Sequence, residues 1–167
     1  MKTYIMVDIE ANGPIPGDYS MTSLGAVIVD EELNKTFKIN IKPISKKFDP
    51  NRRQFVDETD AVNAKEAMQK FKEWILKNSS GKPVFISDNN GFDWMFVCWY
   101  FWHFLNENPF GYNSQNLNSL NKGLNKDLQA KIDLLRKRNL THDALEDAKD
   151  NAKIFLELKK RFFKKNV

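Results

Sequence analysis

The sequence predicts a single α/β domain with a mixed central sheet of about five strands flanked by helices. Its 167 residues suit one ordinary domain. Hydrophobic and charged fractions of 41% and 29% are typical of a globular chain. Along the chain, expected strands come first and expected helices later, an order that favours a mixed sheet covered by helices. Because no repeat or linker divides the sequence, we expect one domain over residues 1–167.

Three strands are predicted in the first quarter of the chain. Residues 3–9 and 23–29 are short apolar runs rich in β-branched side chains, which indicates buried strands. Between them, residues 11–20 contain two glycines and two prolines and are expected to form a loop. Residues 36–43 alternate apolar and polar side chains, as a strand with one wet face does. An antiparallel meander is the simplest arrangement of the three.

A helix and a short strand are predicted next. Apolar side chains recur at helical spacing over residues 60–77, with Asp60 as the expected cap. The sequence Gly81-Lys82-Pro83 should end this element, and residues 84–87 should form a strand. We expect the helix to cover one face of the sheet.

Two longer helices are predicted in the second half. Residues 91–105 are apolar at nearly every position, which indicates a helix buried on several sides. Residues 111–138 are weakly patterned, and we expect only short helical pieces and one brief strand there. A final helix should span residues 141–163. Its expected core stripe consists of Ala144, Ala148, Ile154, Phe155, Leu158 and Phe162.

Charge and cysteine content restrict the function only weakly. Basic residues exceed acidic residues by 26 to 22, which permits a polyanionic partner but is far from a dedicated nucleic-acid coat. The single cysteine cannot form an internal disulfide, and no apolar stretch has the length of a membrane span. We therefore expect a cytoplasmic, soluble protein with no membrane partner.

The first predicted strand contains two acids whose burial needs a compensating partner. Asp8 and Glu10 are two residues apart, so both side chains point to the same face. Burying two unpaired carboxylates costs several kcal/mol, and a hard divalent cation is a natural partner for their oxygens. The alternative is an edge strand that ends in water, and this pair alone does not decide between the two.

Further acids and a histidine occur at two later positions. Asp93 starts the apolar helix, where capping and the helix dipole are, for this residue taken alone, the better explanation of an acid. His142 precedes the last helix and Asp147 lies one turn inside it, so the two can approach one site from different directions. Such a pair can hold a metal and activate its water. Asp143 and Glu146 fit ordinary electrostatics at a helix start.

Together these residues resemble a known family. The sequences VDIE at 7–10, NNGFD at 89–93 and HDALEDA at 142–148 are similar, in order and spacing, to the three motifs of DEDDh 3′–5′ exonucleases. That family includes proofreading subunits of bacterial DNA polymerases, tRNA-trimming exoribonucleases and oligoribonucleases. The resemblance extends from Ile5 to about Ala152 and implies a ribonuclease H-like fold.

The resemblance also implies a role for each acid. Asp8, Glu10 and Asp147 would bind the metal that carries the attacking water, and Asp8 would bridge to a second metal supported by Asp93. His142 would be the general base. Two Mg²⁺ or Mn²⁺ ions would stabilise the attacking and leaving oxygens of an in-line displacement.

Two departures from the family pattern concern the substrate. Ala11 and Asn12 replace the usual threonine pair at positions that resemble those holding the terminal base and sugar. Asp88 precedes Asn89 where the family often has histidine. Phe92 could stack on a terminal base for about 1–3 kcal/mol, although core packing explains it better. Basic residues before His142 could contact phosphates. The expected substrate contacts are Ala11, Asn12, Asn89, Phe92, Arg136 and Arg138.

The substrate is expected to be the 3′ end of single-stranded nucleic acid, with a preference for RNA. A DNA-specific 3′–5′ exonuclease is the nearest alternative. A catalytically inactive nucleic-acid-binding module of the same fold is a third, and the complete set of acids and histidine argues against it. A homodimer is a weaker expectation, based on apolar surface on the aromatic helix.

Overall fold

The fold comes from a computed structural model that describes residues 2–51, 60–137 and 139–163. Arg138 therefore lies outside the described residues. In chain order, the elements are β1 (Lys2–Ala11), β2 (Met21–Ile28), β3 (Thr36–Asn40), α1 (Ala64–Asn78), β4 (Lys82–Ser87), α2 (Asn90–Leu105), β5 (Ser114–Asn116), α3 (Leu117–Asn125), the 3₁₀ helix η1 (Ile132–Leu135) and α4 (Ala144–Phe162).

The strands form one five-stranded sheet in the order β3-β2-β1-β4-β5. The pairs β1–β2 and β2–β3 are antiparallel, which confirms the expected meander. β4 is parallel to β1, and β5 is parallel to β4. The predicted mixed α/β class is thus confirmed. β1 is the central strand, so the alternative that Asp8 and Glu10 end an edge strand is wrong.

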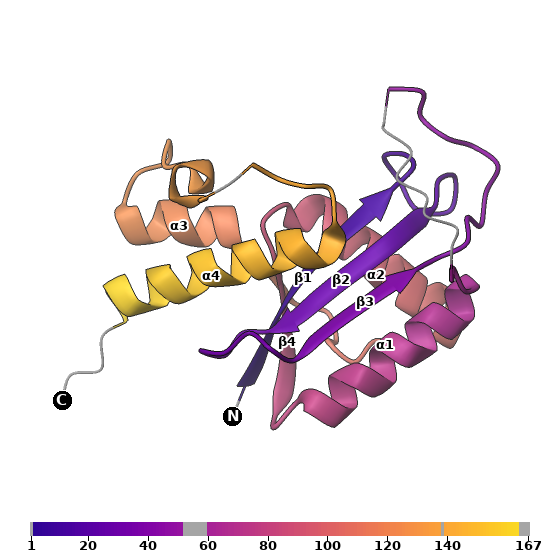
Figure 1. The fold of residues 1–167 in the computed structure, drawn as a ribbon, viewed down its shortest axis with the longest axis horizontal. Helices are drawn as coiled ribbons and strands as arrows, with labels where there is room; N and C mark the ends of the chain where they lie inside the picture. Colours follow the sequence, from indigo (N-terminus) through magenta and orange to yellow (C-terminus); the bar gives the residue numbers. More distant parts are fainter. Residues whose placement is uncertain (1, 52–59, 138, 164–167) are drawn as a thin grey trace.

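Helices cover both faces of the sheet (Figure 1). Each face has its own hydrophobic core. Side chains of β1 at Ile5, Val7 and Ile9 pack with α1 and α2. Met6 points to the opposite face and packs with α3 and α4. Asp8 and Glu10 alternate with Val7 and Ile9, so their side chains lie on the same face of the strand as Met6. The pleat therefore directs both acids toward α4.

Several predicted boundaries and burial patterns were wrong in detail. Helix α1 starts at Ala64 because the side chain of Asn63 accepts the Glu66 N–H at 3.0 Å. Asp60 is not the cap, and its φ is 60°. Strand β3 ends at Asn40 rather than at residue 43. Pro43 has no N–H for a ladder, which fits this early end.

Exposed aromatic side chains lie on both α2 and α4. Trp102 and His103 of α2 are exposed, so this helix is not covered on every side. Phe162 is 38% exposed and lies outside the core stripe of α4, whose other predicted members are buried. The short pieces expected over residues 111–138 are β5, α3 and η1. Within the described residues, no helix has both the length and the apolar character needed to cross a bilayer.

Candidate active site

The candidate site lies where two parallel strands separate. β1 and β4 pair from Lys2 opposite Lys82 to Met6 opposite Ile86, and β4 ends at Ser87. β1 continues for several residues beyond that point and carries Asp8 and Glu10 there. In open α/β sheets, ligands bind in the crevice at the carboxyl ends of such strands. The two acids therefore occupy the position in the fold where a ligand is expected.

Gly25 lets α4 approach β1 at this level. It pairs with Asp8 across the antiparallel β1–β2 ladder. A Cβ added at Gly25 would lie only 2.2 Å from the backbone nitrogen of Leu145, so the first turn of α4 fills the space that a side chain would need. This close contact brings the start of α4, and with it Asp147, next to the two acids of β1.

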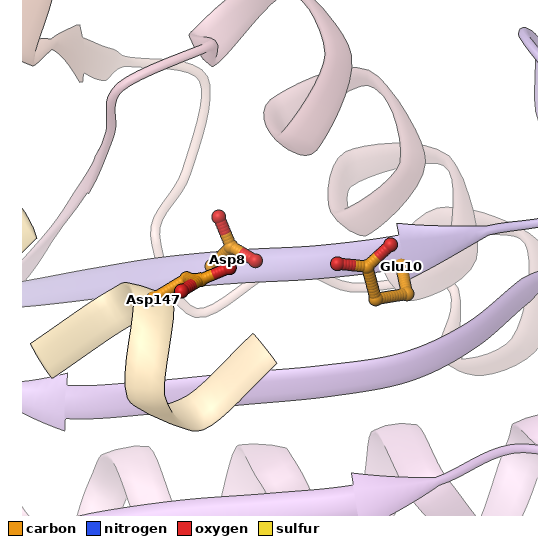
Figure 2. A group of neighbouring side chains, drawn as sticks. All are labelled: Asp8, Glu10 and Asp147. Atoms are coloured by element: carbon orange, nitrogen blue, oxygen red, sulfur yellow. The ribbon is translucent and has the colours of Figure 1, made fainter. Parts of the chain in front are cut away.

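Three carboxylates converge in this place. One carboxylate oxygen from each of three side chains lies within 4.8 Å of the other two oxygens; the side chains are Asp8, Glu10 and Asp147. The first two project from β1 and the third from α4 (Figure 2). The β1–β2 register shifts just after Glu10, which is the kind of bulge that re-aims side chains beside active sites. Oxygen-only donor sets of this kind suit Mg²⁺ and Mn²⁺. The cluster therefore fits a divalent cation.

Asp93 approaches the same region from the first turn of α2. Its Oδ1 accepts the backbone N–H of Ile9 at 3.3 Å, a group of β1 that lies beyond the end of the β4 ladder. Its Oδ2 is buried, with no hydrogen-bond partner among the described residues. Asp93 is not part of the group within 4.8 Å. It thus lies beside the three-carboxylate cluster, with one buried oxygen still able to accept.

Charge repulsion in the site is visible in two pKa values. The pKa of Asp8 is raised well above its usual 3.8, mainly by burial and then by the charges of Asp93, Asp88, Glu10 and Asp147. The pKa of Asp93 is raised by burial and then by Asp88. Bound cations would remove this repulsion.

His142 lies at the edge of the cluster. Its Nδ1 is 3.8 Å from Glu10 Oε1, and half of its side chain is exposed. Its φ is 60°, in the left-handed region that non-glycine residues seldom adopt. Asp147 holds this turn by accepting the N–H groups of His142 and Thr141 at 2.9 Å each and the Thr141 hydroxyl at 2.9 Å. Thr141 was not among the predicted site residues.

Asp143 and Glu146 have the ordinary roles expected for them. The Asp143 side chain caps α4 by accepting the N–H groups of Leu145 and Glu146 at 3.1 and 3.2 Å. Lys38 donates to Asp143 at 2.6 Å, and Lys149 donates to Glu146 at 3.0 Å. Both acids therefore stabilise the start of the helix that carries Asp147.

Asp88 adds a fifth carboxylate near the site, and Arg136 compensates its charge. Arg136 Nη2 is 2.6 Å from Asp88 Oδ2, and the two side chains are only 7% and 14% exposed. Arg136 also binds Asp133 at 3.1 Å. This pair connects the segment before His142 to the turn before α2. A phosphate could reach Arg136 only by competing with these acids.

The other predicted substrate residues are mostly engaged within the protein. Ala11 and Asn12 are buried, and Asn12 Oδ1 accepts the Ser20 N–H at 2.7 Å, closing the base of the loop after β1. Asn89 is exposed, and its carbonyl accepts the N–H of Phe92 at 2.8 Å. Phe92 is half-buried against the core. Substrate contact by these residues stays a prediction.

Comparison with known proteins agrees with the class that fold and acids define. The sequence profile of the 3′-5′ exoribonuclease Rv2179c-like domain matches residues 3–159. The 3′-5′ DNA exonuclease Cap18 of Escherichia coli is 35% identical over 99% of this chain and 96% of its own.

Solved structures show the same fold at low sequence identity. The nuclease domain of 3′hExo, a DEDDh family member bound to rAMP, has a TM-score of 0.73 at 15% identity, over 95% of this chain and 92% of that one. E. coli Exonuclease I in complex with a dA16 oligonucleotide has a TM-score of 0.72 at 17% identity, over 97% of this chain and 41% of that one. The fold is that of the DEDDh, ribonuclease H-like exonucleases.

The chain belongs to the 3′-5′ exoribonuclease Rv2179c-like family. It is a 3′–5′ exonuclease and hence a hydrolase, as the sequence motifs predict.

Proposed function

We propose that this exonuclease removes nucleotides from the 3′ end of single-stranded DNA by a two-metal mechanism. The convergence of Asp8, Glu10 and Asp147 within 4.8 Å is the observation that carries the proposal. A cluster of this charge, formed by the central strand β1 and the first turn of α4, would be stabilised by divalent cations.

The proposed roles follow from the position of each side chain. Asp8, Glu10 and Asp147 would hold one ion, and Asp93 would support a second through its free buried oxygen. When bound, the two ions would stabilise the attacking and leaving oxygens of an in-line phosphoryl displacement. His142 would take the proton of the attacking water, because its exposed ring reaches the edge of the cluster.

Two observations bear on the choice between DNA and RNA. The matching family profile is described as an exoribonuclease, in line with the RNA preference expected from the sequence. The relative that is 35% identical over nearly the whole chain is named a DNA exonuclease. Because that relative matches this chain along its full length, we place DNA first and keep RNA as the second candidate.

End-labelled substrates test the proposal. Purified protein is given single-stranded DNA and RNA of one sequence, labelled at the 3′ or the 5′ end, with Mg²⁺, Mn²⁺ or EDTA. We expect immediate loss of the 3′ label as a mononucleotide, a ladder of shortened 5′-labelled strands, faster decay of DNA and no reaction in EDTA. Asp8→Asn should be inactive, whereas Asp30→Asn, a change at an acid outside the site, should retain activity. Faster decay of RNA would select the second candidate.

Two further expectations concern the protein as a whole. We propose a cytoplasmic location on the basis of the sequence. We also propose a homodimer that uses the exposed apolar side of α2, where Trp102 is 38% exposed. Sedimentation of the wild type and Trp102→Glu tests the dimer, since a monomeric wild type would contradict it.

A further inference from the structure

The segment after β3 is docked onto the loop that follows the acids of β1. Ser20 Oγ accepts the N–H groups of Ile44 and Ser45 at 3.0 and 3.1 Å. The carbonyl of Asn12 accepts the Asp49 N–H at 2.8 Å. Asn12 follows Glu10 by two residues. Residues 44–49 are therefore fixed beside the end of β1 that carries the proposed metal ligands.

Asn12 and Ser20 are also hydrogen-bonded to each other, which holds together the two ends of the loop after β1. The Asn12 N–H donates to the Ser20 carbonyl at 3.0 Å, and the Ser20 N–H donates to Asn12 Oδ1 at 2.7 Å. Ser20 and Asn12 are buried. The segment between the anchor points at Ser45 and Asp49 consists of Lys46, Lys47 and Phe48, and we call it the KKF segment.

The KKF segment presents charge and an aromatic ring to solvent. Phe48 is 52% exposed, an unusual position for a phenylalanine in a segment held by hydrogen bonds on both sides. Lys46 is exposed. Lys47 pairs with Asp18 at 3.1 Å, with side chains 63% and 55% exposed, so this pair contributes little stability and can open to another anion.

We infer that the KKF segment binds the single-stranded nucleic acid on the 5′ side of the scissile bond. An exposed aromatic face stacks on a base without sequence preference, and neighbouring lysines neutralise phosphates. The nucleic-acid strand would run from the acids of β1 to Phe48, whose segment is anchored beside the end of β1. The inference rests on the proposed function, because a nucleic-acid end must be held at Asp8 and Glu10 for this segment to lie on its path.

Binding without cleavage tests the inference. A fluorescein-labelled oligothymidylate of about 12 nucleotides is titrated in EDTA with wild type, Phe48→Ala and Phe163→Ala, and anisotropy is read. Phe163 is 58% exposed and lies at the opposite end of α4 from Asp147, so it is a matched control. Loss of the stacking contact in Phe48→Ala should weaken binding about 5- to 150-fold. Phe163→Ala should bind as wild type does.

A small substrate separates strand binding from damage to the site. Hydrolysis of the p-nitrophenyl ester of thymidine 5′-monophosphate, which has no upstream nucleotides, should proceed at the wild-type rate in Phe48→Ala. Equal losses on this ester and on the oligonucleotide would overturn the inference, as would unchanged oligonucleotide binding. A wild type that cuts nothing while Phe48→Ala loses binding would overturn the proposed function and support this contact.

The lysine contribution has its own readout. Each phosphate contact contributes about 0.7 to the slope of log K against log salt for a single strand. Lys46→Gln should reduce the magnitude of that slope by about this amount, whereas Lys160→Gln, at an exposed site near the end of α4, should leave it unchanged. Identical slopes for Lys46→Gln and wild type would contradict a phosphate contact there.

Discussion

The carboxylate of Asp147 accepts the backbone N–H of His142 at 2.9 Å, so a proposed metal ligand also holds the proposed general base. The same carboxylate accepts both the N–H and the hydroxyl of Thr141. These bonds fix the turn in which His142 has a left-handed backbone with φ of 60°. Metal ligation and base positioning thus depend on one side chain, and changes in this turn should affect turnover more than substrate affinity.

Thr141→Val should lower kcat with little change in KM. The variant removes a hydroxyl that donates to Asp147 at 2.9 Å. Loss of a hydrogen bond to a charged group costs about 1.5–3 kcal/mol, and a loss of about 1.4 kcal/mol in transition-state stabilisation is tenfold in rate. Thr141→Ser restores the donor and should recover most of the rate. Steady-state kinetics on the 3′-labelled strand measure this, and a slow Thr141→Ser would indicate that the methyl group matters instead.

Gly25→Ala should reduce both stability and activity. Its Cβ would meet the backbone of Ala144 and Leu145 at 2.2–2.4 Å, which forces α4 away from β2 and carries Asp147 with it. Overpacking of this kind costs about 1–3 kcal/mol or more. Gly123→Ala is the matched control, since beyond the adjoining backbone of its own helix no described atom lies within 4 Å of the added Cβ, and alanine favours a helix by about 1 kcal/mol. In urea denaturation, the free energy of unfolding should be lower than the wild-type value for Gly25→Ala and higher for Gly123→Ala.

Removing Arg136 alone should lower the free energy of unfolding more than removing both members of its ion pair with Asp88. Arg136→Gln leaves the Asp88 charge uncompensated beside Asp8 and Asp93, and breaking a buried pair in this way costs about 3–5 kcal/mol. The double variant Asp88→Asn with Arg136→Gln should recover much of that loss. Arg161→Gln breaks an exposed pair with Glu157 and should cost under about 1 kcal/mol. Equal losses in the single and double variants would show that Asp88 carries no destabilising charge.

The metal-free protein should lose stability as pH rises. The folded pKa values of Asp8 and Asp93 are raised above 3.8, so the folded state holds protons that the unfolded state has released. The contribution of these two carboxyl groups to stability is therefore largest at acid pH. It decreases as the pH rises from about 4 through the raised pKa values of Asp8 and Asp93. Melting curves in EDTA should show this decline, and Asp8→Asn should flatten it.

Divalent metal should reverse this loss at neutral pH. A ligand at 100 times its Kd adds about 2.7 kcal/mol, which corresponds to a Tm rise of about 5–10 °C for a domain of this size. The rise should be absent in Asp8→Asn. A wild-type Tm at pH 8 that does not respond to Mg²⁺ or Mn²⁺ would contradict a metal site in the cluster.

The sequence predicted the parts of the molecule that depend on local pattern. Strand periodicity placed Asp8 and Glu10 on one face, and the observed pleat sends both toward α4. Apolar spacing placed Ala64, Met68 and Phe71 in the core, where all are buried. The motif order also identified the family. These features follow from side-chain chemistry over short stretches of chain, which a single sequence carries.

Features that depend on distant contacts were not predictable in the same way. No local pattern indicates that Arg136 pairs with Asp88, which is 48 residues away, or that Gly25 admits the first turn of α4. Thr141 adjoins a motif, but its contact with Asp147 depends on the left-handed turn at His142. The cap at Asn63 was missed because two plausible capping residues, Asp60 and Asn63, lie within one turn of each other.

The central claim is that divalent ions held by the acids act on the scissile phosphate. Sulfur substitution at that phosphate tests this claim most directly. A strand with a single phosphorothioate of defined configuration at its 3′-terminal linkage is cleaved in Mg²⁺ and in the softer ion Mn²⁺. The account predicts that one isomer is cleaved at least about tenfold more slowly than the oxygen substrate in Mg²⁺, equivalent to about 1.4 kcal/mol, and recovers in Mn²⁺. Equal rates for both isomers in Mg²⁺, or cleavage that persists in EDTA, would contradict it.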